Sequence, residues 1–324
     1  MHNKAPEYHT PVLGPEVSKH LITDPNGVYV DATLGGGGHA EILLKALGSK
    51  AKLIGIDRDP DAIEAATKRL ATFKDRVLLN RAPFWNLQHI IAEQGPTQIA
   101  GILFDLGISS HQIDDAKRGF SFQQNGPLDM RMGPDAKCTA SEVVNSYSQK
   151  DLTQIIKTYG EERAATRIAR AICLARPIEC TNDLTDVIAQ HIRGPQRQKT
   201  LARVFQAIRI EVNDELTQLE QTLQTAIDLL APNGRIGVLS YHSLEHRVVK
   251  QVFGLGTRDC IGPIDLPICP CERVSVLTLP RGRNIRPEQS EIENNPRARS
   301  ATLRLAQRRN VPAQPWICLQ RTLS

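Results

Sequence analysis

The stretch Val28-Tyr-Val-Asp-Ala-Thr-Leu-Gly-Gly-Gly-Gly-His-Ala40 decides the fold that this sequence predicts. Its β-branched and aromatic start, Val28 to Val30, is typical of a buried strand. Four glycines follow, Gly35 to Gly38, and the apolar spacing from Ile42 to Leu47 predicts a helix. Glycine lets the backbone approach a ligand, and the first N–H groups of a helix point at it, so this corner is suited to a nucleotide. A merely flexible turn is the alternative interpretation.

A second strand strengthens the nucleotide interpretation. Lys52 to Ile56 is apolar enough for a buried strand, and Asp57 follows it directly. In doubly wound sheets an acid about 20 residues beyond the glycines accepts hydrogen bonds from ribose hydroxyls. Pro60 is suited to the first turn of the helix that comes next. The competing interpretation of Asp57 is a turn residue at the end of a strand.

Composition sets broad limits on the protein class. The 324 residues suggest about two domains, and 40% apolar residues allow a sizeable core. No apolar run approaches the ~20 residues of a membrane span, and the N-terminus lacks a signal-peptide core. Seven scattered cysteines predict a reducing cytoplasm. A net charge of +5 permits a polyanionic partner, whereas 4% aromatic residues argue against an extended base-stacking platform.

The alternation of strands and helices predicts a parallel α/β sheet that breaks off after Leu106. Further strands are expected at 76–80 and 99–106, so helices should cover both faces of the sheet. Residues 107–132 are dense in Gly, Asp, Arg and Met, as in a functional loop. Helical periodicity then runs from Ala140 to Leu230, after which strands return at 235–240, 274–279 and 300–305.

We therefore predict a doubly wound α/β domain from residues 1–110 and 213–310. Residues 111–212 would form an inserted loop and all-helical domain for substrate recognition, with a tail at 311–324. His191 falls on an apolar helix face and is expected to be a packed core histidine. Cys260, Cys269 and Cys271 lack the second cysteine pair of a typical zinc site, so no metal is predicted.

Several long motifs resemble the bacterial 16S rRNA cytosine-N4 methyltransferase family. The resemblance covers His9 to about Ala306, nearly the whole chain. The matching segments are Asp31-x-Thr-x-Gly-x-Gly-Gly-His39, Ile56-Asp-Arg-Asp-Pro60, Asp105-Leu-Gly-x-Ser-Ser110, Arg118-Gly-Phe-Ser-Phe122, Gly126-Pro-Leu-Asp-Met-Arg-Met132, Phe205-Gln-Ala-x-Arg-Ile210, Val212-Asn213, His242-Ser-Leu-Glu245 and Asn295-Pro-Arg-Ala-Arg-Ser300. The chain departs from the family pattern at Leu34, Gly36, His111, 199–201 and His246, which stands where an Asp is usual.

The resemblance implies a Rossmann-like methyltransferase that uses S-adenosylmethionine. The implied reaction methylates the exocyclic N4 amine of a specific cytosine of 16S rRNA, cytosine 1402 in the decoding region. The implied partner is 16S rRNA in the small ribosomal subunit or its assembly intermediate; a membrane is not expected, and a homodimer is left open. The implied cofactor contacts are Gly37, Gly38, His39, Asp57, Phe84, Asp105 and Gln112.

The residue chemistry agrees with most of these contacts. Gly37 and Gly38 let the backbone meet the amino-acid end of the cofactor. Phe84 follows the third strand, where an apolar side chain can cover adenine, although it also suits a core aromatic. Asp105 ends the fourth strand, at the edge where open α/β sheets bind ligands. His39 has the alternative of capping the helix.

Four polar residues are candidates to surround the cytosine amine, which is a poor nucleophile because its lone pair is delocalised into the ring. They are Asp105, Ser109, Asp129 and His242. An acceptor hydrogen-bonded to the amine would return electron density to the nitrogen, and in-line alignment would supply much of the rest. The alternatives are structural, since Ser109 can cap a turn and Asp129 can pair with Arg131.

Two other function classes compete with an RNA methyltransferase. A DNA amine methyltransferase shares the glycine corner, but the proline-rich motif usual there is missing after the fourth strand. A non-catalytic nucleic-acid binder could keep the same core. Arginine favours phosphate because its planar fork bonds two oxygens, so an RNA surface is expected near the arginine-rich C-terminal region. Arg118, Arg131, Arg203 and Arg209 add to it in the loop and helices.

Overall fold

The computed structural model describes residues 11–192, 196–261, 273–282 and 284–316. The chain divides into two compact units, which we describe separately. Unit 1 comprises residues 1–107 and 218–324, and unit 2 comprises residues 108–217. The domain limits expected from the sequence, with 111–212 as the insertion, stay a prediction. Cys269 and Cys271, considered above for zinc, lie outside the described residues, as do His9, where the resemblance starts, and Arg283 of the arginine-rich C-terminal region.

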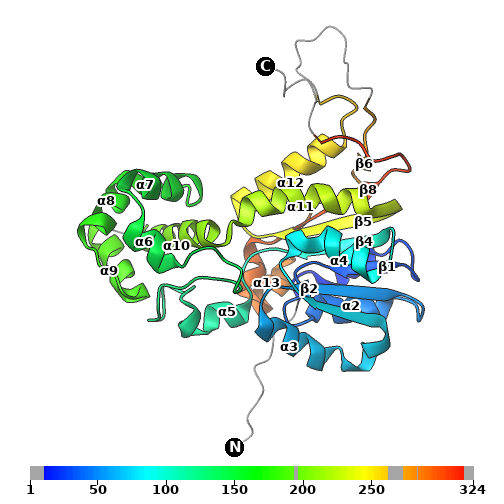
Figure 1. Cartoon of the computed structure of the whole chain (residues 1–324), viewed down its shortest axis with the longest axis horizontal. Helices are drawn as coiled ribbons and strands as arrows, with labels where there is room; N and C mark the ends of the chain where they lie inside the picture. Colours follow the sequence, from blue (N-terminus) through cyan, green and yellow to red (C-terminus); the bar gives the residue numbers. More distant parts are fainter. Residues whose placement is uncertain (1–10, 193–195, 262–272, 283, 317–324) are drawn as a thin grey trace, which may run out of the picture. The chain divides into compact units, whose positions relative to one another are not determined.

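Unit 1 is built on a mostly parallel sheet (Figure 1). Its described strands follow the order β3-β2-β1-β4-β5-β8-β6, and β7 pairs with β8. β1, β2, β3, β4 and β5 are parallel, whereas β8 runs antiparallel to β5. The strands are β1 (Val28–Asp31), β2 (Lys52–Asp57), β3 (Val77–Arg81), β4 (Ile99–Asp105), β5 (Leu230–Ser240), β6 (Leu277–Thr278), β7 (Asn284–Ile285) and β8 (Thr302–Arg308).

The strand order reverses between β1 and β4, so the sheet has a topological switch point there. The chain builds outward from β1 to β2 and β3, and then crosses to β4 and β5 on the other side. Ligands of open α/β sheets bind at the carboxyl ends of the strands beside such a point. The doubly wound α/β fold predicted from the sequence is confirmed.

Two hydrophobic cores lie on the two faces of this sheet. Successive strand residues alternate between them: Tyr29 and Leu53 belong to one core, Val30 and Ile54 to the other. Helices α1, α2 and α3 supply residues to the first core, and α4, α11 and α12 supply residues to the second. The helices are α1 (Gly14–Leu21), α2 (Gly38–Ala46), α3 (Pro60–Arg69), α4 (Leu87–Gln94), α11 (Glu215–Leu229), α12 (Ser243–Gly256) and α13 (Gln289–Asn294), with 3₁₀ turns η1 (Ala71–Arg76), η2 (Phe84–Asn86) and η4 (Pro296–Ser300).

The described part of unit 2 is helical around its own core. α10 supplies Leu201, Val204, Phe205 and Ile208 to that core and packs against α6, α7 and α9. The elements are α5 (Ser110–Asp114), η3 (Ala116–Arg118), α6 (Ala140–Ser146), α7 (Gln149–Thr158), α8 (Ala165–Leu174), α9 (Thr181–His191) and α10 (Arg197–Asn213). Among the described residues of both units, no helix is long and apolar enough to cross a membrane.

The structure corrects several local expectations. His191 is exposed rather than packed in a core, because α9 ends there and its ring Nδ1 bonds Val187 O at 2.9 Å. β5 begins at Leu230 and not at Arg235, because the strand continues through a bulge beside β4. β6 keeps only Leu277–Thr278 of the six residues expected at 274–279.

Candidate active site

Three aspartates lie at the carboxyl ends of three neighbouring strands of unit 1. Asp31 ends β1, Asp57 ends β2 and Asp105 ends β4, and β1 pairs with both neighbours. Parallel strands present their carboxyl ends at one edge of the sheet, so these side chains gather at the switch point. Burial raises the pKa of all three.

The glycine turn lies directly over this edge. Gly35 and Gly37 have φ of +50° and +77°, a left-handed conformation that glycine adopts without strain. α2 then starts at Gly38, so its free N–H groups face the turn. A Cβ built on Gly35 would meet no atom within 4 Å, which leaves this backbone open to a ligand.

Asp57 ties the glycine turn to β2. Its Oδ2 accepts a hydrogen bond from Gly35 N at 2.8 Å, and its Oδ1 accepts one from Asp59 N at 2.9 Å. Burial raises the pKa of Asp57 to about 6, although these two bonds lower it in part. Each oxygen keeps a second lone pair for a ligand hydroxyl.

Asp31 is the most unusual of the three acids. It is buried, and its Oδ1 accepts a long hydrogen bond from Thr33 N at 3.3 Å. Its buried Oδ2 has no hydrogen-bond partner among the described residues. Burial raises the pKa of Asp31 to about 7, and the nearby Asp105 and Asp57 add to the rise. An unpaired buried acceptor is costly, so this position is ready for a cationic or hydrogen-donating ligand.

Asp105 is held by residues far away in the sequence. Tyr241, directly after β5, donates its hydroxyl to Asp105 Oδ1 at 2.7 Å. The backbone N–H of Asp105 donates to Thr33 Oγ1 at 2.6 Å. Burial raises the pKa of Asp105, whereas His39 and Tyr241 act to lower it. These contacts fix the orientation of the Asp105 carboxyl group at the end of β4, and its Oδ2 faces His39.

The hydrogen bonds of His39 define its tautomer. Its Nε2 lies 2.9 Å from the carbonyl oxygen of Val12, which can only accept, so Nε2 carries a proton. Its Nδ1 lies 3.5 Å from Asp105 Oδ2. His39 thus connects the carbonyl oxygen of Val12 with the carboxyl group at the end of β4.

Phe84 lies at the start of η2, after β3, as the sequence placed it. Its ring packs against the second core of unit 1, edge-on to Phe104 at 6.0 Å between centroids. A second edge contact joins it to Trp85, whose ring lies under the Arg58 guanidinium at 5.0 Å. Phe84 is only partly buried, so one part of the ring remains accessible.

His242 serves as the N-cap of α12. Its Nδ1 accepts from Glu245 N at 3.4 Å, and Glu245 Oε2 accepts from Tyr241 N and His242 N at 2.7 and 3.2 Å. His242 Nε2 lies 3.1 Å from Glu245 Oε1 but outside hydrogen-bond geometry. His246, which departs from the family pattern, places its Nδ1 2.6 Å from Ser240 Oγ.

The remaining predicted residues belong to unit 2. Ser109 caps α5: its Oγ accepts from Gln112 N at 3.2 Å, and Gln112 Oε1 accepts from Ser109 N at 3.0 Å. Asp129 forms a two-pronged ion pair with Arg131, at 2.9 Å to Nε and 2.7 Å to Nη2. Ser109 thus caps a helix and Asp129 pairs with Arg131, which are the structural roles that the sequence offered as alternatives.

The structure brings together Gly37, Gly38, His39, Asp57 and Asp105 at one edge of unit 1, with His242 one residue beyond Tyr241. Sequence reasoning missed Asp31, Thr33 and Tyr241 as contributors to that edge. Asp31 and Tyr241 each stand at or directly after the end of a predicted strand, which was the signal that could have found them. Thr33 lies inside the quoted glycine motif.

Comparisons with known proteins identify the family of the chain. A family model described as the MraW methylase family matches residues 7–309. Ribosomal RNA small subunit methyltransferase H of Heliobacterium modesticaldum is 44% identical over 308 residues, 93% of this chain and 98% of that protein. Its namesake from Geobacter sulfurreducens is 47% identical over 306 residues, again 93% and 98%.

Solved structures align over similar lengths. An rRNA methylase from Streptococcus thermophilus covers 96% of this chain and 100% of its own, with 14% identity and a TM-score of 0.41. The family model and the curated relatives carry the assignment, since the family model spans the switch point, the glycine turn and the whole of unit 2, and each relative aligns with 93% of the chain. The chain belongs to the MraW methylase family and is an S-adenosylmethionine-dependent methyltransferase.

Proposed function

We propose that this chain methylates the exocyclic N4 amine of a cytosine in 16S rRNA, cytosine 1402 of the decoding region. The observation that carries the substrate class is the name shared by relatives 43–47% identical over 92–93% of the chain, ribosomal RNA small subunit methyltransferase H. The site suits an amine acceptor, because Tyr241 orients the Asp105 carboxyl group, whose oxygens can accept a hydrogen bond from an amine N–H.

The residues at the switch point fit the cofactor. S-adenosylmethionine carries a sulfonium and an ammonium, which suit the unpartnered buried Oδ2 of Asp31 and the neighbouring raised-pKa acids. Its carboxylate suits the N–H groups at the start of α2. Gly37, Gly38 and His39 would hold the amino-acid end, Asp57 the ribose, Phe84 the adenine and Asp105 the region nearest the methyl group. Gln112 is proposed as a further contact from the resemblance alone.

Asp105 is the acceptor in the proposed reaction. When bound, S-adenosylmethionine supplies the methyl carbon: N4 bonds to that carbon as the S–C bond breaks, and N4 gives up one proton. Asp105 accepts a hydrogen bond from N4–H, which returns electron density to the amine, and then takes the proton. Tyr241 fixes one oxygen of Asp105, and His39 balances the charge on the other.

Ser109, Asp129 and His242 have narrower proposed roles. Each already makes structural contacts, as a helix cap or as the partner of Arg131. We assign them to the surroundings of the target base and not to proton transfer. The substrate is proposed to be 16S rRNA in the small subunit or its assembly intermediate, which places the enzyme in the cytoplasm; a homodimer is compatible with this proposal.

Transfer of a labelled methyl group tests the function. The purified protein is incubated with labelled S-adenosylmethionine and, separately, 16S rRNA, assembled small subunits, 23S rRNA and double-stranded DNA. We expect label in 16S rRNA or the subunit alone, and N4-methylcytidine on nucleoside mass spectrometry. Label in DNA would favour the DNA amine methyltransferase, and binding without transfer would favour a non-catalytic RNA binder.

A further inference from the structure

An unusually well-anchored turn in unit 2 runs from Asp129 to Met132. On its N-terminal side, the backbone at Pro127 packs directly against the backbone at Gly119. A Cβ on Gly119 would lie only 2.0 Å from Pro127 O, so glycine is needed there. The two first N–H groups of α6 donate to this region, Ala140 N to Asp129 O at 2.8 Å and Ser141 N to Leu128 O at 2.7 Å. Loop carbonyls thus satisfy donors that a helix start leaves free.

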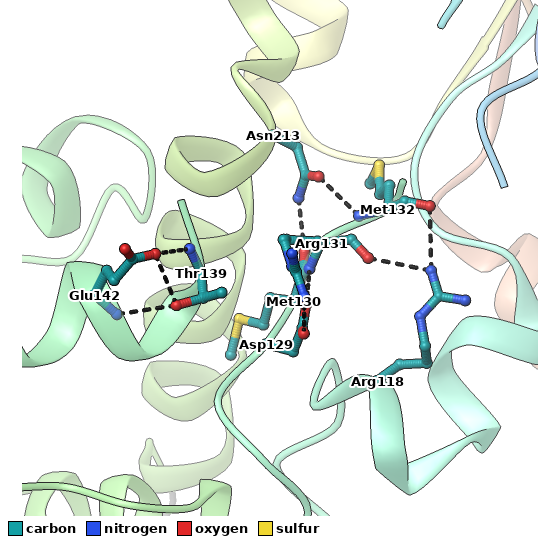
Figure 2. Close-up of polar contacts among 8 residues, drawn as sticks. All are labelled: Arg118, Asp129, Met130, Arg131, Met132, Thr139, Glu142 and Asn213. Atoms are coloured by element: carbon teal, nitrogen blue, oxygen red, sulfur yellow. Dashed lines mark hydrogen bonds and ion pairs between the residues drawn. The ribbon is translucent and has the colours of Figure 1, made fainter. Parts of the chain in front are cut away.

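Met130 has a strained backbone at the centre of the Asp129–Met132 turn. Its φ is +58°, which a non-glycine residue adopts at a cost of about 1–3 kcal/mol, and its side chain is buried in the core of unit 2. Asn213, at the end of α10, holds the turn on both sides of this residue: its Oδ1 accepts from Met132 N at 2.9 Å and its Nδ2 donates to Met130 O at 2.8 Å (Figure 2).

Arg118 fixes the other side of the Asp129–Met132 turn. Its Nη2 donates to the carbonyl oxygens of Arg131 and Met132, both at 3.1 Å (Figure 2). Three chain segments, at Arg118–Gly119, the start of α6 and the end of α10, therefore determine the path of the turn. Such strain persists only where the surroundings over-determine it, and it concentrates at functional positions.

The Asp129–Met132 turn presents one guanidinium. The Asp129 carboxylate accepts hydrogen bonds from Nε and Nη2 of Arg131. Its Oδ1 also accepts one from the backbone N–H of Arg131 at 3.0 Å. The Arg131 side chain is 41% exposed. Its Nη1 has no hydrogen-bond partner among the described residues. Asp129 therefore orients the fork and leaves the Nη1 donors, with one N–H of Nη2, available for an outside acceptor.

We propose that Arg131 is an RNA-binding residue that donates to a pair of acceptors on the substrate, and that Asp129 is its positioning residue. This inference rests on the proposed function. The acceptors have one chemistry with two sources in RNA, the oxygens of a phosphate or the O6 and N7 atoms of a guanine. A pre-oriented fork loses little side-chain entropy on binding, which is the advantage of the anchored turn.

The other arginines named from the sequence in this unit make different contacts. Arg209 is bonded through Nε and Nη2 to Glu215 and is mostly buried, so it is a scaffold residue. Arg118 holds backbone carbonyls of the turn itself. Arg203 lies 3.4 Å from Glu162. Among these four arginines, Arg131 combines a two-pronged ion pair with an exposed guanidinium.

Binding of in vitro transcribed 16S rRNA to the Arg131→Gln variant is the test. The Asp129–Met132 turn should survive, because Asp129 keeps its bond to the backbone N–H of residue 131. A phosphate contact predicts that the salt slope of log Kobs falls by about 0.7. A guanine contact predicts an unchanged slope, with binding on the order of tenfold weaker. Arg170→Gln, an exposed arginine on α8, is the matched charge control and should bind as wild type.

The Asp129→Asn variant separates this inference from direct catalysis by Asp129. If Asp129 only positions Arg131, KM for RNA should rise while kcat changes little, and Arg131→Gln should add no further loss. Loss of kcat with unchanged RNA affinity would overturn the proposal. So would wild-type affinity and salt slope in a folded Arg131→Gln variant. Failure of the proposed function would instead appear in the wild type, as absent methyl transfer to 16S rRNA.

Discussion

The carboxyl edge of unit 1 and the Asp129–Met132 turn of unit 2 treat acidic side chains in opposite ways. At the edge, Asp31 is buried and Asp57 and Asp105 are partly buried, and desolvation raises the pKa of each. In the turn, burial would also raise the pKa of Asp129, but the hydrogen bonds and charge of Arg131 lower it overall. The carboxyl groups at the edge therefore have raised pKa values, whereas Asp129 in the turn forms an ion pair with Arg131 that lowers its pKa.

This difference separates a ligand site from a scaffold. A buried acceptor without a partner costs stability, which binding of a complementary ligand can recover. An acid already held by an arginine gains nothing further from a cation, and its effect is to fix the arginine. The comparison therefore agrees with the two proposals, that the cationic cofactor binds at unit 1 and that Arg131 binds acceptors on RNA.

Replacing Asp105 should have the largest effect. Asp105→Ala removes the proposed proton acceptor, so we expect methyl transfer to 16S rRNA to fall at least about 100-fold, the scale of a lost general base. Labelled-methyl transfer measures the rate, and circular dichroism controls for folding. Near-normal turnover in a folded variant would remove Asp105 from the reaction and weaken the contrast between the two regions.

Replacing Asp57 should lower the affinity for S-adenosylmethionine more than it lowers the rate of methyl transfer. Asp57→Ala leaves ribose hydroxyls unpaired, and we expect S-adenosylmethionine affinity to fall by ~1–3 kcal/mol. Titration calorimetry measures this loss. Because Asp57 also accepts from Gly35 N, thermal unfolding of the cofactor-free variant is the control. An unchanged affinity would show that the acid only shapes the glycine turn.

Replacing Asp31 should stabilise the cofactor-free protein in a pH-dependent way. The folded-state pKa of Asp31 is raised to about 7 from the ordinary 3.8, so its contribution to stability is present at low pH and is lost as the pH rises from about 4 to 7. Asp31→Asn avoids that loss. We expect its free energy of unfolding to exceed that of the wild type by on the order of 1–3 kcal/mol at pH 8 but by little at pH 4. Urea unfolding across this range measures it.

The same Asp31→Asn variant should bind S-adenosylmethionine more weakly than wild type. Stabilisation combined with weaker cofactor binding would confirm that the unpaired acid exists for the ligand. A stability difference that is the same at pH 4 and pH 8 would contradict the assignment of a raised pKa to this carboxyl group.

Replacing Tyr241 should have the smallest effect. Tyr241→Phe removes the hydroxyl that helps to lower the pKa of Asp105. Because the reaction needs ionised Asp105, the acid limb of the pH–rate profile should move to higher pH, with kcat at pH 7 falling about 5–10-fold. Recovery of the rate at high pH distinguishes this role from a structural one. An unmoved acid limb would show that Tyr241 is only a packing residue.

The sequence alone was sufficient to predict the glycine corner where we propose that the cofactor binds. A buried strand, four glycines and an apolar-periodic helix are local signals, and Asp57 and Asp105 follow predicted strands directly, so topology alone places them at one edge. His191 shows the limit of this reasoning. Its spacing matched an apolar face, but the helix ends at that residue and leaves the ring exposed.

Only the tertiary structure decided which acids are paired and which are not. Tyr241 meets Asp105 across 136 residues, and Asn213 reaches Met130 across 83. In neither pair does the local sequence around one residue predict its contact with the other. Asp31 follows the same rule, because only the fold leaves its Oδ2 without a hydrogen-bond partner among the described residues, whereas the pairing of Asp129 with Arg131 was already an alternative in the sequence. Local sequence sets which groups lie at a strand end or in a turn, whereas their charge state depends on burial and on neighbours that the fold brings together.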